Sequence, residues 1–472
     1  MKGKGKMTTY KNFIDSKKQI EKNYGFKPIF VHDDLFEFQN YLVDWSLRKG
    51  RSAIFADCGL GKTPIQLVWA ENIVRKTNKR VLILTPLAVS AQTIEEGIKF
   101  GIDCKRSKIG KFKSSSKIIV TNYERLKYFN PNDFEAVVCD ESSILKNFKG
   151  VYKNDITKFM HKIKYRLLCT ATASPNDYTE LGTSSEALGY LGYIDMLQKF
   201  FKANDNSYAQ GGTNQKSFVN RKPLQDGKFR FRGHAEDNFW RWVSSWARTI
   251  RKPSDFGYED NDFILPELKS NLHVIQNRVV KKGYLIEPPN RSLREQREER
   301  RRTLPERCEK AAEITNNTKD FTICWCNLND ESKMLSKLID NSVEVTGSDP
   351  EEKKEEAFIG FKKGEFKVLV TKSLIAGMGM NFQHCQHQTF FPTHSFEQWY
   401  QSIRRSWRFG QKNAVTIDMI ASEGETEILK NLNRKEKAAQ KMYDEIVRLM
   451  GNALEIKKDT GLKLKEEIPS WL

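Results

Sequence analysis

The sequence predicts an α/β protein with two parallel-sheet domains in tandem and a helical segment inserted between them. Short apolar runs rich in β-branched residues recur in residues 28–200 and again in 320–422, and each is followed by a polar loop or a helical pattern. The region between them changes in composition. The length of 472 residues is about three times the ~150 residues of one typical domain, so two or three cores fit.

Apolar runs are the expected strands, because strands of a parallel sheet are buried on both faces and read as short continuous apolar segments. In the first domain they are SAIFAD, RVLILTP, KIIVTNY, AVVCDES and YRLLCTAT. In the second domain they are FTICWCN, VEVTG, KVLVTK, QTFFPT and VTIDMIAS. Strands that alternate with helical patterns indicate parallel sheets with helices packed on them.

The composition divides the chain into five parts. Residues 1–27 are expected to form a basic, flexible N-terminus, and 28–200 the first domain. Residues 201–262 form the insertion, which contains the tryptophan-dense helix NFWRWVSSWARTIRKP. The second domain, 263–425, includes a charged linker helix that we expect to be solvated, and 426–472 form a mixed-charge helical tail.

Charge and hydropathy narrow the class of function. The chain carries 79 Lys and Arg against 60 Asp and Glu, a net charge of +19, which favours a polyanionic partner such as nucleic acid. A lysine-rich composition that serves only solubility would give the same excess. No apolar run approaches the ~18 residues of a membrane span, so no membrane partner is expected. The eight cysteines show no pattern of a disulfide scaffold, and we expect a cytoplasmic location.

The strongest chemical signal is SAIFADCGLGKT, in which an apolar strand enters a glycine-rich loop that is followed by the helical pattern IQLVWAENIV. Glycines let backbone N–H groups face phosphates, and the helix N-terminus adds positive potential. The loop residues expected to bind a nucleotide are Gly59, Leu60, Gly61, Lys62 and Thr63. Lys62 would reach the β- and γ-phosphates and Thr63 would hold Mg²⁺. Ala56 stands where the full pattern has a glycine.

A second signal is AVVCDESS, in which a buried strand ends at Asp140 and Glu141. Ligands of parallel sheets bind at the carboxyl ends of the strands. Asp140 fits a Mg²⁺ ligand, and Glu141 fits the base that orients and deprotonates water. Two adjacent carboxylates after a strand are by themselves weak evidence for a nucleotide site. The evidence becomes stronger because a glycine-rich loop lies 78 residues upstream (140 − 62 = 78).

A third signal is QWYQSIRRSWRFGQ near the end of the second domain. Arg405 and Arg408 are three residues apart, a spacing that places them on one face of a helix. Arginines that reach a nucleotide from another domain can stabilise charge on the transferring phosphoryl group. A cationic surface helix that touches DNA phosphates is the alternative interpretation. Gln401, one helical turn before Arg405, is assigned to the same catalytic block.

These three blocks, in this order, resemble the motor core of superfamily 2 helicases, and within it the Swi/Snf-like ATPases. Gln39, in LFEFQNYLVDW, is similar to the family's adenine-reading glutamine, and Gly379 lies in a segment that resembles its fifth motif. The remaining blocks that carry the resemblance are LTPLAVSAQT and IIVTNYERL at strand ends, DESSILKN, the coupling motif CTATASPND, and TKSLIAGMGMNFQ.

The sequence departs from the family's pattern at two places. Ser142 and Ser143 replace an Ala-His pair, and Arg404 stands where many relatives carry an aspartate. These departures, with the segment FWRWVSSWARTIRKPSDFGYEDNDFILPEL, resemble versions encoded by bacteriophages.

The resemblance implies two RecA-like domains that bind ATP and Mg²⁺ between them, and a monomeric motor that translocates on DNA. Duplex DNA is favoured, with little sequence preference because phosphate contacts carry little sequence information. A strand-separating DNA or RNA helicase is the alternative, and a catalytically dead DNA-binding protein is a further one. A phage-encoded version would act in the host cytoplasm.

A basic run, a group of tryptophans and a pair of cysteines can each be interpreted either as structural or as functional. The basic run 105–117 fits a solvated loop, with a phosphate-tracking edge as the alternative. The tryptophans of 240–246 fit one side of a helix packed on the core better than base-stacking platforms. Cys324 and Cys326 alternate along one strand without any CxxC pair, so packing is favoured over zinc binding.

Overall fold

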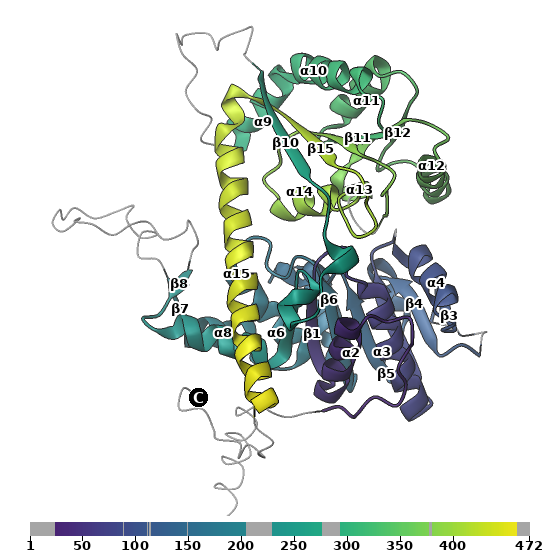
Figure 1. The fold of residues 1–472 in the computed structure, drawn as a ribbon, viewed down its shortest axis with the longest axis vertical. Coiled ribbons are helices and arrows are strands. Elements are labelled where there is room, and N and C mark those ends of the chain that lie inside the picture. The colour runs from purple at the N-terminus through teal and green to yellow at the C-terminus, as the bar shows by residue number, and fades with distance from the viewer. Residues whose placement is uncertain are drawn as a thin grey trace, which may run out of the picture.

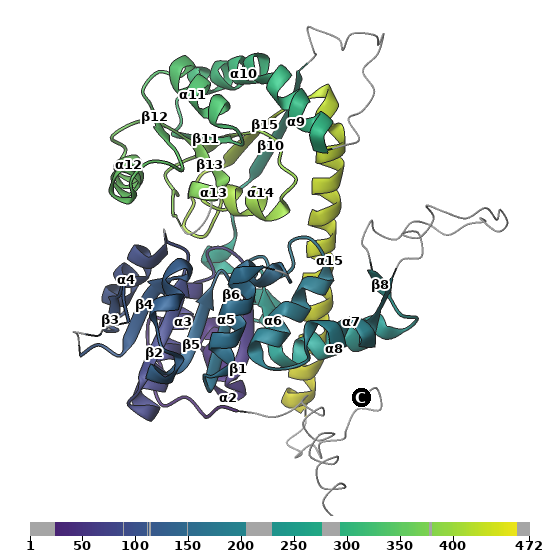
Figure 2. The same cartoon turned by 180° about the vertical axis from the view of Figure 1, so that it is seen from behind.

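Two parallel sheets form the two domains, and the long helix α15 (Thr426–Asp459) lies beside both of them (Figure 1, Figure 2). The computed structural model describes residues 24–87, 89–110, 112, 115–148, 150–203, 229–275, 293–376 and 380–459. The expected fold class of two RecA-like parallel-sheet domains in tandem is confirmed. Among the described helices, none is both long and apolar enough to cross a membrane.

The first sheet has the strand order β3-β4-β2-β5-β6-β1-β9, and every neighbouring pair is parallel. Its strands are β1 Arg51–Ala56, β2 Arg80–Thr85, β3 Cys104–Arg106, β4 Ile118–Asn122, β5 Phe134–Asp140, β6 Tyr165–Thr170 and β9 Ala247–Ile250. The strands expected in the first domain are all present. Those missed, β3 and β9, are short edge strands.

Helices cover both faces of this sheet: α2 and α3 lie on the face seen in Figure 1, and α5 and α6 on the face seen in Figure 2. The helices of the first domain are α2 Glu37–Lys49, α3 Lys62–Thr77, α4 Val89–Lys99, α5 Val151–His161, α6 Leu181–Leu188, α7 Tyr193–Phe200 and α8 Ala235–Trp246.

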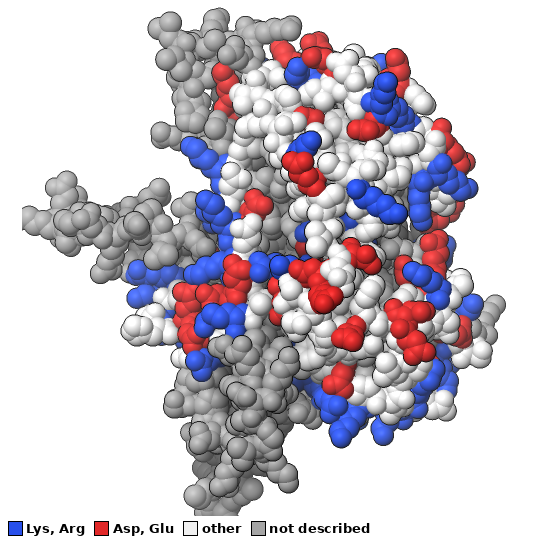
Figure 3. Space-filling view, viewed as in Figure 1, with Lys and Arg blue, Asp and Glu red and all other residues white. Residues whose placement is uncertain are grey.

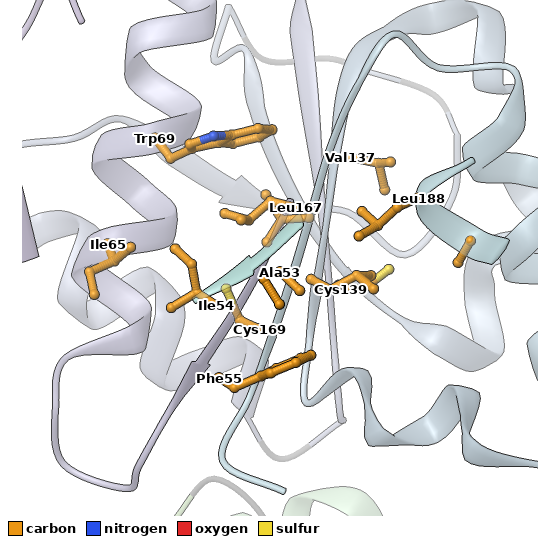
Figure 4. Close-up of a cluster of buried hydrophobic side chains, with 14 of the residues drawn as sticks. Ala53, Ile54, Phe55, Ile65, Trp69, Val137, Cys139, Leu167, Cys169 and Leu188 are labelled. Carbon is orange, nitrogen blue, oxygen red and sulfur yellow. The ribbon is translucent and has the colours of Figure 1, made fainter. Parts of the chain in front are cut away.

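The core of the first domain lies on both sides of the central strands (Figure 4). On one side, Ile54 of β1 and Leu167 of β6 point toward Trp69 of α3. On the other, Val137 of β5 lies close to Leu188 of α6. All five side chains are fully buried. This packing fixes the carboxyl ends of β1 and β5, where the predicted site residues begin.

The second sheet has the order β10-β15-β14-β11-β13-β12 and is also parallel throughout. Its strands are β10 Leu268–Ile275, β11 Thr322–Cys326, β12 Ser342–Val345, β13 Val368–Lys372, β14 His387–Phe390 and β15 Val415–Ser422. Its helices are α9 Leu293–Arg302, α10 Leu304–Asn317, α11 Asn329–Leu338, α12 Glu351–Lys363, α13 Ser373–Ala376 and α14 Phe396–Ile403. The strands expected here are present, and β10 was missed because it is an exposed edge strand.

Successive residues of β11 point to opposite faces of this sheet, as the strand period requires. Ile323 and Trp325 pack in one cluster, whereas Cys324 and Cys326 pack in another with α10 and α11. Within the described ranges, no group of three or more His, Cys, Asp and Glu side chains is arranged to hold a metal ion. Cys324 and Cys326 are buried in the second of these two clusters, which is the packing expected for them.

The first domain extends past the boundary expected at residue 200. β9 pairs with β1, with Ala247 opposite Ala53, and so completes the first sheet. The tryptophans of α8 are buried in the first core, which confirms packing over base stacking. The strand ARTI was missed because it has only four residues, two of them polar. Residues 204–228 of the expected insertion lie outside the described part of the chain.

Two other expectations need correction. The charged linker helix is not a solvated spacer, because α10 packs into the second domain and buries Arg307 against Glu331, with N and O atoms 2.8 Å apart. The N-terminal segment 1–27 is only partly described: the backbone of Tyr24 and Gly25 hydrogen-bonds to the end of α2. The basic stretch before Tyr24 lies outside the described residues.

Helix α8 supplies a test of the corrected boundary. Phe239 is fully buried and packs on Phe200 of α7 with ring centroids 5.6 Å apart. Phe239→Ala is expected to lower the free energy of unfolding of the first domain by about 3–5 kcal/mol, because it leaves a cavity in the core. Denaturant unfolding followed by tryptophan fluorescence measures this. Tyr128→Ala, at a side chain that is 53% exposed, is the control. Equal effects of the two would contradict a shared core.

Candidate active site

A cleft of about 760 Å³ lies between the two domains and brings together most of the predicted site residues. The predicted residues that line it from the first domain are Gln39, Gly59, Gly61, Lys62, Thr63, Asp140 and Glu141. Those from the second domain are Arg405 and Arg408. Segments more than 340 residues apart in the sequence (405 − 62 = 343) thus face the same space.

The glycine-rich loop, residues 57–61, joins the end of β1 to Lys62, the first residue of α3. Gly59 and Gly61 have φ values of 91° and 75°, in the left-handed region that favours glycine. A Cβ atom at Gly59 would also lie 2.8 Å from the backbone nitrogen of Phe409 in the second domain. The turn and the close approach of the two domains therefore both require glycine at this position.

Lys62 and Thr63 begin α3 and line the cleft. Lys62 Nζ donates hydrogen bonds to the carbonyl oxygens of Ala56 and Asp57 at 3.0 and 3.3 Å, which folds its side chain back over the loop. The first turn of a helix has backbone N–H groups without helical partners, and its dipole is positive at this end. An ammonium group, a hydroxyl and a helix N-terminus thus converge where a phosphate chain would bind.

Gln39 of α2 attaches this helix to the glycine-rich loop. Its Nε2 donates to the carbonyl oxygen of Leu60 at 3.1 Å, and its Oε1 accepts from the backbone N–H of Phe36 at 3.0 Å. A Cβ atom on Gly61 would lie 2.2 Å from the same Nε2. Leu60 contributes its carbonyl group, since its side chain is buried.

Asp140 is the last residue of β5 and is buried in the floor of the cleft. Its Oδ1 accepts a hydrogen bond from Gln66 Nε2 of α3 at 2.7 Å. Burial, and then the neighbouring carboxylate of Glu141, raises the pKa of Asp140 to about 6. A buried carboxylate with a raised pKa gains stability from a nearby cation, which suits a ligand of Mg²⁺.

Glu141 follows at once in a strained backbone conformation, with φ 50° and ψ 53°. This left-handed geometry is uncommon for a residue with a Cβ atom and concentrates at functional sites. Glu141 Oε2 accepts from Thr170 Oγ1 of β6 at 3.2 Å and from Gln401 Nε2 of the second domain at 3.4 Å. The carboxylate is thereby oriented from both domains.

Arg405 and Arg408 do not share a helix face, which corrects the sequence-based expectation. Helix α14 ends at Ile403, and both arginines lie in the arginine turn, residues 404–410. The helix ends because Arg405 Nε donates to the carbonyl of Gln401 at 2.8 Å and the carbonyl of Arg405 accepts from the N–H of Phe382. The turn still directs both guanidinium groups into the cleft.

Gln401 does not line the cleft but connects its two sides. Its Oε1 accepts from Arg405 Nη2 at 2.7 Å, while its Nε2 donates to Glu141. A chain of hydrogen bonds therefore runs from the carboxylate of the first domain to the arginine of the second. Gly379 lies outside the described residues, and Asn381, two residues further along the chain, lines the cleft.

Basic and acidic side chains line the cleft in equal number, four of each. Partial burial, and then the charge of Arg405, lowers the pKa of Arg408 to about 10. The Nε atom of Arg408 has no hydrogen-bond partner among the described residues. An anion with several oxygens would satisfy these donors and those of Lys62. The donor set therefore fits the triphosphate of ATP, with Thr63 and Asp140 as protein ligands of Mg²⁺.

Sequence reasoning missed an aromatic cluster at the Gln39 end of the cleft. Phe263, from the segment between the domains, stacks on Phe409 with ring centroids 4.5 Å apart and planes at 25°. Phe36 packs edge-on against Phe263 at 5.0 Å. The three rings line the cleft. No sequence signal joins them because they come from three separated segments.

The buried carboxylate predicts a pH dependence of stability. Asp140 has an ordinary pKa of 3.8 and a pKa of about 6 in the folded protein, so the folded state holds this proton more tightly. The stabilisation is complete below about pH 4 and is lost as the pH rises to about 6. In buffer with EDTA, Asp140→Asn should raise the thermal midpoint above about pH 6, with a smaller gain near pH 4. Melting curves across this range measure the gain.

Asp133→Asn, at an exposed position, is the matched control for the loss of one negative charge. A gain from Asp140→Asn that is equal at every pH would show that the carboxylate is not the titrating group.

Comparisons with known proteins agree with this architecture. Residues 305–410 match the helicase conserved C-terminal domain. Dbp5 of S. cerevisiae, bound to RNA and ADP BeF3, is 11% identical with a TM-score of 0.53, over 87% of this chain and 93% of that chain. The SWI2/SNF2 ATPase core of Sulfolobus solfataricus, in complex with dsDNA, is 16% identical with a TM-score of 0.40, over 93% and 99% of the two chains.

A search of curated proteins gave no match. At identities this low the structural likeness shows the fold. Residues 305–410 thus match a helicase C-terminal domain, and the chain as a whole has the tandem RecA-like fold found in superfamily 2 helicases.

Proposed function

We propose that this protein is a nucleic-acid-stimulated ATPase that translocates on DNA as a Swi/Snf-like member of the superfamily 2 helicases. The observation that carries the proposal is the cleft itself, where a glycine-rich loop, two carboxylates and two arginines meet from separate domains. This set supplies every group that phosphoryl transfer to water requires. The match of residues 305–410 to a helicase C-terminal domain favours a motor over other ATPases.

The first domain would bind the nucleotide. Lys62 and the N–H groups at the start of α3 would hold the β- and γ-phosphates. Gln39 would lie beside the adenine ring of ATP, near the aromatic cluster. Thr63 and Asp140 would hold Mg²⁺, which neutralises phosphate charge when bound. Glu141 would accept the proton of the attacking water, since its carboxylate is aimed into the cleft.

The second domain would supply the charge that stabilises the transition state. Arg405 and Arg408 reach the cleft from the arginine turn. Gln401 hydrogen-bonds to both Arg405 and Glu141, so the proposed base and the arginine would be oriented at the same time when the domains are closed. Hydrolysis removes the γ-phosphate that both domains contact, and the cleft can then open. This cycle of closure and opening is the basis of stepping along a strand.

Helix α15 connects the two domains and would transmit the movement of one to the other. It leaves the second sheet after β15 and packs along the coupling motif of the first domain, where Tyr443 OH donates to the carbonyl of Ala171. Tyr178 OH, one residue past the motif, donates to the carbonyl of Ala438 at 3.0 Å. Lys435 Nζ donates both to Asn176 Oδ1 of the first domain and to the carbonyl of His394 in the second, at 2.9 and 2.8 Å. Movement of the second domain would therefore be transmitted to the residues beside Glu141.

DNA is the proposed partner because of the net charge of +19 and the Swi/Snf-like motifs. The face in Figure 3 shows basic and acidic side chains intermixed over its described residues, and we place the nucleic acid elsewhere. RNA is the second candidate, since the structural neighbour with the higher TM-score is an RNA-bound protein. We propose that the protein acts as a monomer in the cytoplasm, or in a host cytoplasm if a bacteriophage encodes it.

Steady-state ATP hydrolysis tests the proposal directly. Hydrolysis is expected to rise on addition of duplex DNA, and Lys62→Ala is expected to lower it by roughly 100-fold or more, because the main phosphate-binding cation is lost. The assay compares no nucleic acid, duplex DNA, single-stranded DNA and RNA at two salt concentrations. Greater stimulation by single strands or RNA would support a strand-separating helicase. No activity above Lys62→Ala under any condition would refute the proposed function.

Glu141→Gln tests whether Glu141 acts as the general base or only helps to bind the nucleotide. The amide keeps the size of the side chain but cannot accept a proton, so turnover should fall by roughly 10²–10⁴-fold while ATP still binds. Fluorescent nucleotide binding beside turnover measures both. If nucleotide binding is lost together with turnover, Glu141 is needed for binding and is not assigned as the base.

Arg405→Ala and Arg408→Ala test the contribution of the second domain. Each is expected to reduce kcat by roughly 10³-fold or more with a smaller effect on nucleotide affinity, because arginine fingers act mainly on the transition state. Arg241→Ala, which removes a surface ion pair of the first domain, is the control. Normal turnover in both cleft variants would exclude arginine fingers from this turn.

A further inference from the structure

Arg404, one of the two places at which this chain departs from the pattern of the family it resembles, forms a buried ion pair with the glycine-rich loop of the other domain. Arg404 Nη2 donates to Asp57 Oδ2, and the hydroxyl of Tyr400 donates to Asp57 Oδ1. The same Oδ1 accepts from the backbone N–H of Cys58 at 2.6 Å. The side chains of Arg404 and Asp57 are only 9% and 5% exposed.

Neither charge would be stable at this depth without the other. A buried guanidinium or carboxylate without its partner carries a large desolvation penalty. Burial alone lowers the pKa of Arg404, but the carboxylate of Asp57 and the hydroxyl of Tyr400 outweigh it and leave the pKa above its ordinary value. The rings of Tyr400 and Trp407 lie 5.2 and 4.5 Å from the guanidinium carbon. The pair is therefore built into the closed arrangement of the domains.

The ion pair lies next to the residues that act on the nucleotide. Arg404 immediately precedes Arg405, and Asp57 opens the glycine-rich loop. Arg405 Nη2 comes within 3.9 Å of Cys58 Sγ. The backbone of Phe409 approaches Gly59 so closely that no Cβ atom would fit. A shift of either member would therefore move the arginine turn relative to the loop.

We propose that Arg404 is a positioning residue, which pairs with Asp57 across the domain interface and sets Arg405 and Arg408 against the glycine-rich loop. The inference deepens the proposed function and rests on it for its kinetic consequence. The closed shape of the protein is a separate consequence, because the pair joins the two domains directly through their own side chains. Opening of the cleft would have to break the pair.

A double-mutant cycle tests the pair. Arg404→Gln and Asp57→Asn, which remove the charges but keep polar side chains, are each expected to lower kcat by roughly 10- to 100-fold, since small misplacements of catalytic groups have effects of this size. KM for ATP should change much less. The double variant should be no worse than either single variant, because the two residues act as one unit. Arg404→Lys should recover part of kcat by restoring the charge.

Arg48→Gln, which removes an exposed ion pair with Asp44 within α2, is the matched control. Circular dichroism of each variant establishes that it is folded. Wild-type kcat in Arg404→Gln, or losses that add in the double variant, would overturn the proposal.

Small-angle X-ray scattering without nucleotide supplies the readout that does not depend on activity. The radius of gyration of Arg404→Gln and Asp57→Asn should exceed that of the wild type and of Arg48→Gln. If the wild-type protein hydrolyses no ATP, the proposed function fails, whereas an expansion of these variants would still support the ion pair as the contact that closes the cleft. Unchanged shapes would overturn it.

Discussion

Buried charge at the interface of two domains is the constraint on which the rest of this structure depends. The cleft is lined by two arginines of one turn, the lysine of α3 and the two carboxylates at the end of β5, and the neighbouring residues Arg404 and Asp57 form a buried ion pair. Charges are tolerated at this depth only where each has a partner or where a ligand will supply one. Asp57 compensates the charge of Arg404, and the Nε atoms of Arg404 and Arg408 both lack a hydrogen-bond partner among the described residues.

The same constraint explains why the site is divided between domains. Glu141 has its strained backbone in the first domain, but its carboxylate receives a hydrogen bond from Gln401 in the second. Arg405 is held by that same glutamine. Glu141 and Arg405 are therefore oriented by one side chain, which joins the two domains. Neither domain by itself holds all the side chains that meet in this cleft.

Much of the fold followed from local patterns. Apolar runs bounded by loops predicted the central strands of both sheets, and residue type with spacing predicted the residues that meet in the cleft. The edge strands β3, β9 and β10 were not predicted. β3 and β9 are short and β10 is largely exposed, so none of them has a continuous apolar run. The boundary after residue 200 was misplaced for the same reason, since β9 returns to the first sheet after α8.

The sequence by itself determined the chemistry of each half-site, because glycine conformations, a helix start and strand-end carboxylates are local properties. Tertiary structure alone decided how the halves meet. The Arg405 side chain and carbonyl end helix α14 through contacts with Gln401 and Phe382, so both arginines lie in a turn. Asp57 and Arg404 are 347 residues apart, and their pairing depends on the closure of two separate sheets. No local pattern records such a contact, since its energy arises only when both partners leave water together.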